Sequence, residues 1–153
     1  MATTRSEHDQ WKATAAQAAI AMVEDGMIVG LGTGSTASFA LGMLGQRVAE
    51  GLRVIGIPTS EQTAREARRL GIPLSTLEER DHIDVTIDGA DEVEVGTLAL
   101  LKGRGGALLR EKIIASASRQ LIIVVDETKL VQRLGVKSPV AIEVVPFGWS
   151  ATA

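Results

Sequence analysis

Short runs of apolar residues alternate along this chain with longer stretches in which apolar and charged positions are interleaved. The apolar runs predict strands at 27–31, 53–57, 83–87, 121–125 and 141–145, with a further short one at 74–77. The interleaved stretches predict helices at 7–25, 37–50, 61–70 and 107–118. Short buried strands that alternate with helices are typical of βαβ units, whose strands pair in parallel. We therefore predict an α/β fold with a mostly parallel, Rossmann-like three-layer sheet, in which 121–125 is a central strand.

Composition limits the kinds of protein to which the chain can belong. Its 153 residues are 45% hydrophobic, which suits one domain with a real core, and its net charge of −3 argues against a general nucleic-acid binder. The absence of cysteine excludes disulfides, thiolate metal sites and cysteine nucleophiles. The first residues are polar and the longest apolar runs are too short to cross a bilayer, so we expect a cytoplasmic protein with no membrane partner.

Four polar clusters stand at points where a predicted strand ends or a predicted helix begins. They occupy 33–36, 88–92, 102–105 and 126–129. Ligands of open α/β sheets bind beyond the carboxyl ends of the strands. We therefore expect the four clusters to converge on one edge of the sheet.

The first cluster has the features of an anion site. An apolar strand runs into Gly32-Thr-Gly-Ser-Thr36 and a helix follows, which would present backbone N–H groups, hydroxyls and a positive helix end together. A dinucleotide fingerprint fits poorly, because Ser35 replaces its third glycine and no acid follows the second strand before Glu61. A Walker A lysine is also absent. A monophosphate site fits better, and a tight turn capped by Thr33 or Ser35 is the alternative.

The remaining clusters carry acids and lysines. Three carboxylates at 88, 91 and 92 indicate a turn before a helix or, alternatively, a magnesium site, whereas His8 and His82 have no partner at a transition-metal spacing. Lys102 precedes a glycine-rich loop, and Glu111 lies on the helix that this loop opens. The Glu111 carboxylate could point into a cleft or belong to a solvated helix face. Lys129, and Lys12 on the first helix, are candidate cations for a phosphate or ordinary solvated lysines.

Taken together, these segments resemble ribose-5-phosphate isomerase of the A type. The likeness covers nearly the whole chain and rests on five stretches in the family's order. They are Gly32-Thr-Gly-Ser-Thr36, Asp88-Gly-Ala-Asp-Glu92, Lys102-Gly-x-Gly-Gly-Ala-Leu-x-Arg-Glu-Lys112, Asp126-x-x-Lys129 and Glu143-Val-Val-Pro146.

The resemblance implies an aldose–ketose isomerase of the non-oxidative pentose phosphate pathway, which needs neither metal nor cofactor. It would interconvert D-ribose 5-phosphate and D-ribulose 5-phosphate through an enediolate. By motif position, Glu111 would be the catalytic base, Asp88 would assist ring opening with Asp91 beside it, and Lys102 would stabilise the enediolate oxygen. The substrate-binding residues would be Thr33, Gly34, Ser35, Thr36, Gly89, Ala90, Gly103, Arg104, Gly105, Lys129 and Lys12. The implied partner is a small-molecule sugar phosphate, and the full-length family is expected to form a homodimer or homotetramer.

The family pattern continues well past Pro146, through a smaller α+β domain and back to the first domain. On this basis 1–146 is interpreted as an incomplete Rossmann-like catalytic domain and 147–153 as the start of a missing C-terminal portion. Uncovered apolar surface would then make the chain poorly stable or prone to aggregation.

Three rival interpretations remain open from the sequence. A non-catalytic sugar-phosphate sensor would use the same phosphate loop but would not need Glu111 and Lys102 together. An acyl-CoA transferase would need a glutamate nucleophile and a CoA groove, and an amino-sugar-phosphate deaminase would need a histidine near its acids, for which His82 is a remote candidate. An inactive remnant that merely folds is the third.

Overall fold

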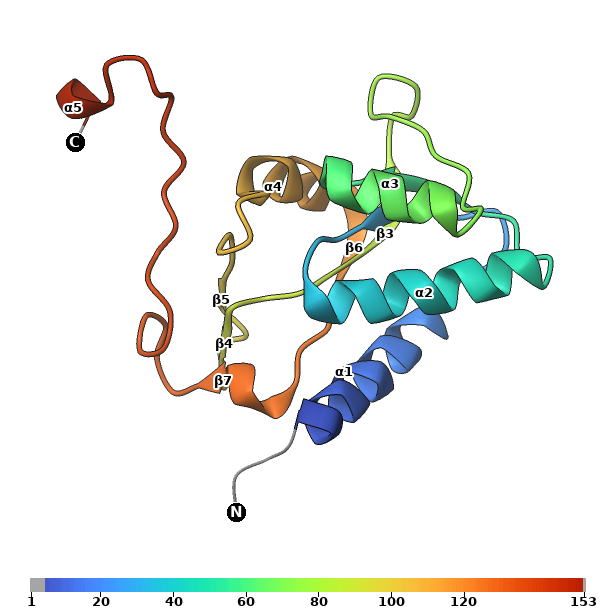
Figure 1. Cartoon of the computed structure of the whole chain (residues 1–153), viewed down its shortest axis with the longest axis horizontal. Coiled ribbons are helices and arrows are strands. Elements are labelled where there is room, and N and C mark those ends of the chain that lie inside the picture. Colours follow the sequence, from blue (N-terminus) through green and yellow to red (C-terminus); the bar gives the residue numbers. More distant parts are fainter. Residues whose placement is uncertain (1–4, 153) are drawn as a thin grey trace.

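A four-stranded parallel sheet organises the protein, whose computed structural model describes residues 5–152 (Figure 1). Its strands are β1 (Ile28–Leu31), β2 (Ile55–Pro58), β3 (Ile83–Asp88) and β6 (Ser118–Ile123), in the order β2-β1-β3-β6. Every pairing among them is parallel, with Val29 opposite both Gly56 and Val85. The predicted α/β fold with a parallel sheet is confirmed.

Helices cover both faces of this sheet. Helices α1 (Arg5–Ile20) and α2 (Ser35–Ala49) pack on one face, where Val85 and Ile87 of β3 enter the larger hydrophobic core. Helix α4 (Leu108–Ser116) packs on the other face through Ile114, and α3 (Glu61–Arg69) lies beside β2. Each fully buried aliphatic side chain stabilises such a core by about 1.5–3 kcal/mol. The three-layer arrangement therefore follows from strands that are apolar on both faces.

Helix α1 is shorter than the sequence pattern predicts. It ends at Ile20 and not near residue 25. Arg47 of α2 donates from Nη1 to the carbonyl oxygens of Ile20 (2.6 Å) and Val23 (2.9 Å), which satisfies carbonyls that a longer helix would have used internally. A contact between residues so distant in sequence is not visible in the local pattern.

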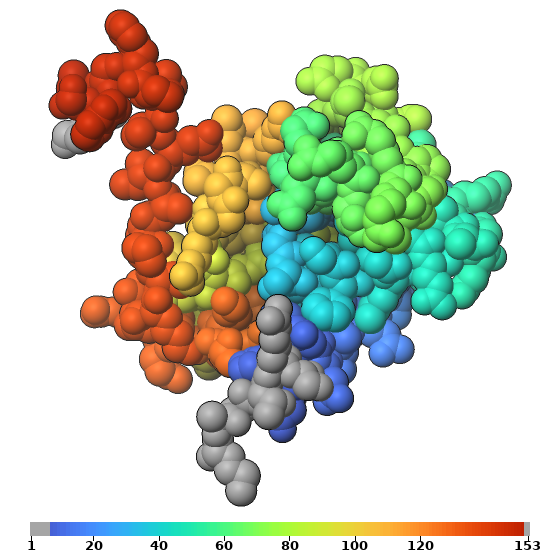
Figure 2. Space-filling view, in the orientation of Figure 1, coloured from blue at the N-terminus to red at the C-terminus, as the bar shows by residue number. Residues whose placement is uncertain are grey.

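Three strand predictions are wrong in position or existence. The predicted central strand 121–125 is β6, shifted to Ser118–Ile123, and it lies at the edge of the sheet. Residues 141–145 form no strand: they run as an extended segment beside the body of the protein (Figure 2), with Ile142 79% exposed. The run 74–77 contributes a single bridge, between Leu74 and Gly56. An apolar run signals extended backbone, but it does not supply a pairing partner.

A second, three-stranded sheet was not predicted at all. It contains β5 (Leu100–Leu101), β4 (Glu92–Glu94) and β7 (Leu130–Val131), with β4 in the middle. Strands of two or three residues are too short to show a period of two. A final short helix, α5 (Trp149–Thr152), follows the extended segment, and across residues 5–152 no helix combines the length and hydropathy needed to span a bilayer.

The buried carboxylate of Glu92 holds the loop after β7 against β4. Its side-chain oxygens accept hydrogen bonds from the backbone N–H groups of Gly135, Lys137 and Ser138, each at 2.6 Å. Burial opposes ionisation, but these three donors outweigh it and hold the pKa of the Glu92 carboxyl below its ordinary value. The residue therefore acts as an ionised clamp on the segment 135–138.

We therefore expect the free energy of unfolding to decrease in acid as Glu92 takes up a proton. A carboxyl whose pKa is lower in the folded than in the unfolded chain stabilises the fold above the unfolded value, about 4.3, and this contribution disappears as the pH falls through the folded pKa. Urea unfolding of the wild type and of Glu92→Gln between pH 7 and pH 3 measures it. We expect Glu92→Gln to be less stable at pH 7 and to show a weaker pH dependence. Exposed Glu50→Gln serves as the control, and equal slopes for all three proteins would contradict the assignment.

Candidate functional site

A cavity of about 120 Å³ lies at the carboxyl edge of the parallel sheet, beyond the ends of β1 and β3. Four segments that are far apart in sequence contribute to its wall. The lining residues are Thr33, Gly34, Ser35, Thr36, Ala37, Gly89, Ala90, Asp91, Lys102, Gly103, Arg104, Gly105, Glu111 and Lys129. All the candidate site residues of the sequence analysis line the cavity except Asp88 and Lys12, and Ala37 is an additional lining residue. Asp88 lies directly behind the wall, in contact with Lys102 and the loop after β1, and so belongs to the site.

One wall of the cavity is the N-terminal end of α2. Gly34 is the N-cap residue, with φ of 117°, a left-handed conformation that favours glycine. No side chain caps the helix, so the alternative in which Thr33 or Ser35 serves as its cap is wrong. The first N–H groups of a helix have no intrahelical acceptor, and here they come from residues that line the cavity. This wall can therefore bind an anion through backbone donors and the hydroxyls of Ser35 and Thr36.

The loop before α2 lies directly against Asp88 at the end of β3. A Cβ on Gly32 would come within 2.3 Å of Asp88 Oδ1, so only glycine permits this approach. Asp88 Oδ1 accepts hydrogen bonds from the backbone N–H groups of Thr33 (3.2 Å) and Gly89 (2.8 Å). One carboxylate oxygen therefore joins the loop after β1 to the loop after β3, and Asp88 itself is only 1% exposed.

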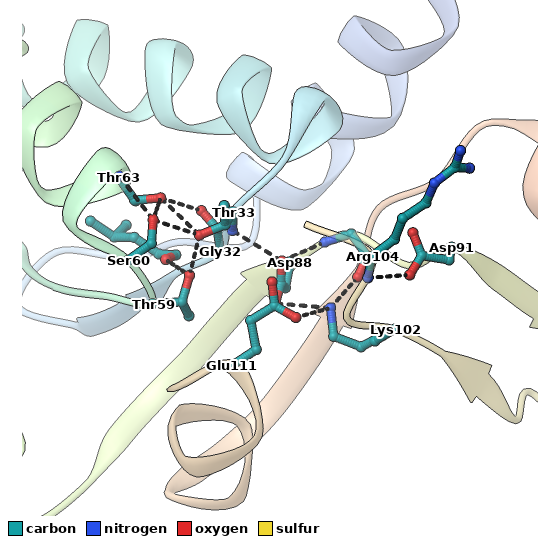
Figure 3. Close-up of polar contacts among 12 residues, drawn as sticks. Gly32, Thr33, Thr59, Ser60, Thr63, Asp88, Asp91, Lys102, Arg104 and Glu111 are labelled. Atoms are coloured by element: carbon teal, nitrogen blue, oxygen red, sulfur yellow. Dashed lines mark hydrogen bonds and ion pairs between the residues drawn. The ribbon is translucent and has the colours of Figure 1, made fainter. Parts of the chain in front are cut away.

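Lys102 connects the two buried carboxylates of the site (Figure 3). Its Nζ lies 3.0 Å from Asp88 Oδ2 and 3.4 Å from Glu111 Oε2, and it also donates to the carbonyl oxygen of Gly89. The ammonium group is thus held by three oxygens at the floor of the cavity. A cation in this position can stabilise negative charge that develops on a bound molecule.

Glu111 occupies the first turn of α4 and is buried, with 6% of its surface exposed. Burial raises the pKa of the Glu111 carboxyl above its ordinary value; the charge of Asp88 raises it further, and Lys102 opposes both. Its Oε2 faces Lys102 but makes no hydrogen bond of good geometry. Among the buried side-chain nitrogen and oxygen atoms of the described residues, it is the one that lacks a hydrogen-bond partner. A carboxylate with a free lone pair and a raised pKa is suited to accepting a proton.

The three acids at 88, 91 and 92 do not form a metal site. Asp88 faces Lys102, Asp91 accepts from the backbone N–H of Arg104 (3.0 Å), and Glu92 binds the loop at 135–138. Within residues 5–152 no three acid, histidine or cysteine side chains are grouped so as to hold a metal ion. The magnesium alternative of the sequence analysis therefore lacks a converging donor set.

The lysine candidates separate in the structure. Lys129 lines the cavity from the 3₁₀ turn Glu127–Lys129. Lys12 on α1 pairs with Asp9 at 3.8 Å and does not line the cavity.

Sequence reasoning overlooked the hydroxyl groups that follow β2. Thr59, Ser60 and Thr63 all contact the side chain of Thr33 (Figure 3). The signal was present, since Thr59-Ser60 ends the second strand just as Thr33 follows the first.

Curated proteins that are similar to this chain are described as ribose-5-phosphate isomerase A. Residues 55–153 match the family model of ribose 5-phosphate isomerase A (phosphoriboisomerase A). A ribose-5-phosphate isomerase A of Gloeobacter violaceus is 64% identical over 145 residues, which are 95% of this chain and 63% of that protein.

Solved structures of ribose-5-phosphate isomerases also resemble this chain. Ribose 5-phosphate isomerase from Plasmodium falciparum has a TM-score of 0.89 at 46% identity, over 94% of this chain and 62% of that one. A D-ribose-5-phosphate isomerase in complex with phospho-erythronic acid has a TM-score of 0.90 at 44% identity, over 94% and 63%. The chain thus spans a little under two thirds of the length of the proteins it matches.

Proposed function

The chain belongs to the ribose 5-phosphate isomerase A family, and from this premise we propose that it carries the site that interconverts D-ribose 5-phosphate and D-ribulose 5-phosphate. The observation that supports the proposal most strongly is the ion pair of buried Glu111 with the partly exposed Lys102 at the floor of a cavity whose wall is a helix N-terminus. An anion-binding end and an acid–base end therefore share one small space.

The phosphate of the substrate would bind at the α2 N-terminus, with the hydroxyls of Ser35 and Thr36 and the ammonium group of Lys129 as side-chain partners. The carbonyl end of the sugar would then lie toward Lys102 and Glu111. Binding energy from the phosphate, which takes no part in the reaction, can be used to orient the reacting carbons.

The reaction then needs one base and one cation. Glu111 takes the proton from C2 of the open-chain aldose and returns it to C1, while a second proton moves from O2 to O1. Lys102 faces the oxygen that carries negative charge in the enediolate between these steps. All atoms and electrons stay within one molecule, so the conversion balances without an added oxidant or reductant. Asp88 and Asp91 stand beside this end of the cavity, where they would assist opening of the furanose ring.

A non-catalytic sensor accounts for less of the geometry. A sensor needs the phosphate wall, but it gains nothing from an ionisable carboxylate buried against a lysine, which costs desolvation free energy. Assembly into a homodimer or homotetramer, and the absence of nucleic-acid and membrane partners, remain part of the proposal.

Exchange of the C2 proton of ribose 5-phosphate with solvent tests the function directly. In D₂O, proton NMR should show loss of the C2 proton signal and the appearance of ribulose 5-phosphate that carries deuterium at C1. Free ribose, which lacks the phosphate, is the control substrate and should exchange far more slowly. Saturable binding of ribose 5-phosphate without any exchange would favour the sensor and contradict the isomerase.

A further inference from the structure

The loop 32–36, which connects β1 to α2, is called the phosphate loop below. A cluster of four hydroxyl groups lies behind it, on the side away from Asp88 (Figure 3). Its centre is Thr33 Oγ1, which lies 2.7 Å from Thr59 Oγ1, 2.9 Å from Ser60 Oγ and 3.0 Å from Thr63 Oγ1. Thr59 is completely buried and Thr63 is 5% exposed. None of these three partners lines the cavity described above, although Thr59 and Ser60 line a neighbouring one that shares Thr33 with it.

The cluster also holds the backbone of the loop. Thr59 Oγ1 donates to the carbonyl oxygen of Leu31 (2.9 Å), and Thr63 Oγ1 donates to that of Gly32 (3.1 Å). Ser60 Oγ in turn accepts from the N–H of Thr63 (3.1 Å) and so caps α3. The loop after β1 is therefore fastened to the start of α3 by side chains that come from one turn.

Counting hydrogens fixes the role of Thr33. A hydroxyl has one hydrogen to donate, and those of Thr59 and Thr63 are directed at backbone carbonyls. The hydrogen of Ser60 is directed at Thr63 Oγ1, so none of the three groups has a hydrogen left for Thr33. Thr33 therefore donates its single hydrogen into the cluster, to Ser60 Oγ. The Thr33 side chain is committed to anchoring, and this leaves the anion to the amides and hydroxyls of residues 34–36.

We infer that Thr59, Ser60 and Thr63 are positioning residues for the phosphate loop, an inference that rests on the proposed function for its substrate. They act through Thr33 and Gly32 and do not touch the ligand. Because Gly34 has φ of 117° and no side chain caps α2, the loop conformation depends on contacts from outside the helix. The hydroxyl cluster supplies these contacts on one side and Asp88 supplies them on the other.

Thr63→Val is the decisive variant, because valine keeps the shape of threonine and removes the hydroxyl. We expect it to raise KM for ribose 5-phosphate, or its Kd measured by NMR titration, about tenfold, while kcat changes by less than about twofold. Thr63→Ser, which keeps the hydroxyl, should restore KM to near the wild-type value. Thr86→Val is the matched control: Thr86 is a buried threonine like Thr63, but its hydroxyl lies 2.6 Å from that of Ser118 and makes no contact with the loop.

A second measurement needs no ligand. Hydrogen exchange of the Thr33 amide, which donates to Asp88, should be faster in Thr63→Val than in Thr86→Val after correction for global stability. If the wild type binds ribose 5-phosphate but does not convert it, the isomerase proposal fails and Kd decides this inference. If the wild type does not bind it, exchange at Thr33 decides. Equal exchange in both valine variants, or equal Kd where binding is measurable, would overturn the positioning role.

Discussion

Glu111→Gln is expected to lower kcat for the isomerisation of ribose 5-phosphate by on the order of 10²–10⁴, the usual contribution of a positioned general base. Glutamine has nearly the same shape as glutamate, so the cavity and its wall at the N-terminal end of α2 should remain intact. Kd for ribose 5-phosphate should therefore change by less than about threefold. Steady-state kinetics gives kcat, and an NMR titration gives Kd.

The fold of this variant should not suffer. Burial raises the pKa of Glu111 in the folded chain, so its ionised form makes folding less favourable above the unfolded pKa, and removing the charge relieves that cost. The pH profile is an independent check, since wild-type kcat should fall in acid as Glu111 takes up a proton, starting at a higher pH than for an exposed glutamate. Glu50→Gln on the surface is the control. A Glu111→Gln protein with normal kcat and weakened binding would contradict the assignment.

Lys102→Met is expected to reduce kcat by on the order of 10²–10³, which is the cost of losing one stabilising group next to a developing oxyanion. Methionine preserves much of the length of the side chain without its charge. Removing one member of a buried charge cluster costs about 3–5 kcal/mol of stability when all members are fully buried, and less when one is partly exposed. Lys102 is partly exposed, with 22% of its side chain accessible, so we expect a smaller loss.

The stability that Lys102→Met loses should be larger at neutral pH than in acid. Without Lys102, Asp88 and Glu111 are two buried carboxylates with no cation between them, which raises the pKa of Glu111 further. Stability lost at pH 7 should therefore be partly recovered as the pH falls, because Glu111 binds a proton at a higher pH than an exposed glutamate does. Lys112→Met on the exposed face of the same helix is the control. Equal kcat and equal stability for the two methionine variants would show that Lys102 plays no part in the site.

The glycine-rich loop and its neighbours could be predicted from sequence because their signals are local. The glycines and hydroxyl residues of 32–36 follow an apolar strand directly. In the same way, Lys102 stands just before a glycine-rich turn and Glu111 on the helix just after it. The edge position of β6 could not be predicted, because strand order depends on contacts between distant segments. Sequence could indicate that hydroxyl residues follow β2, but not that they contact Thr33. Thr33 and Thr63 are 30 residues apart, and packing of α3 on β2 brings them together.

The sharing of Asp88 has a consequence for ligand design. One oxygen of this carboxylate receives the amides of Thr33 and Gly89, and the other faces Lys102. A compound that orders the loop 32–36, at the proposed phosphate end of the cavity, therefore also orders the surroundings of Lys102. Thermodynamic linkage requires that a compound bound beside Lys102 favours binding at the phosphate end by the same factor. Fragments that occupy these two positions separately should reinforce each other, so an inhibitor that joins them gains from this reciprocity as well as from its own contacts.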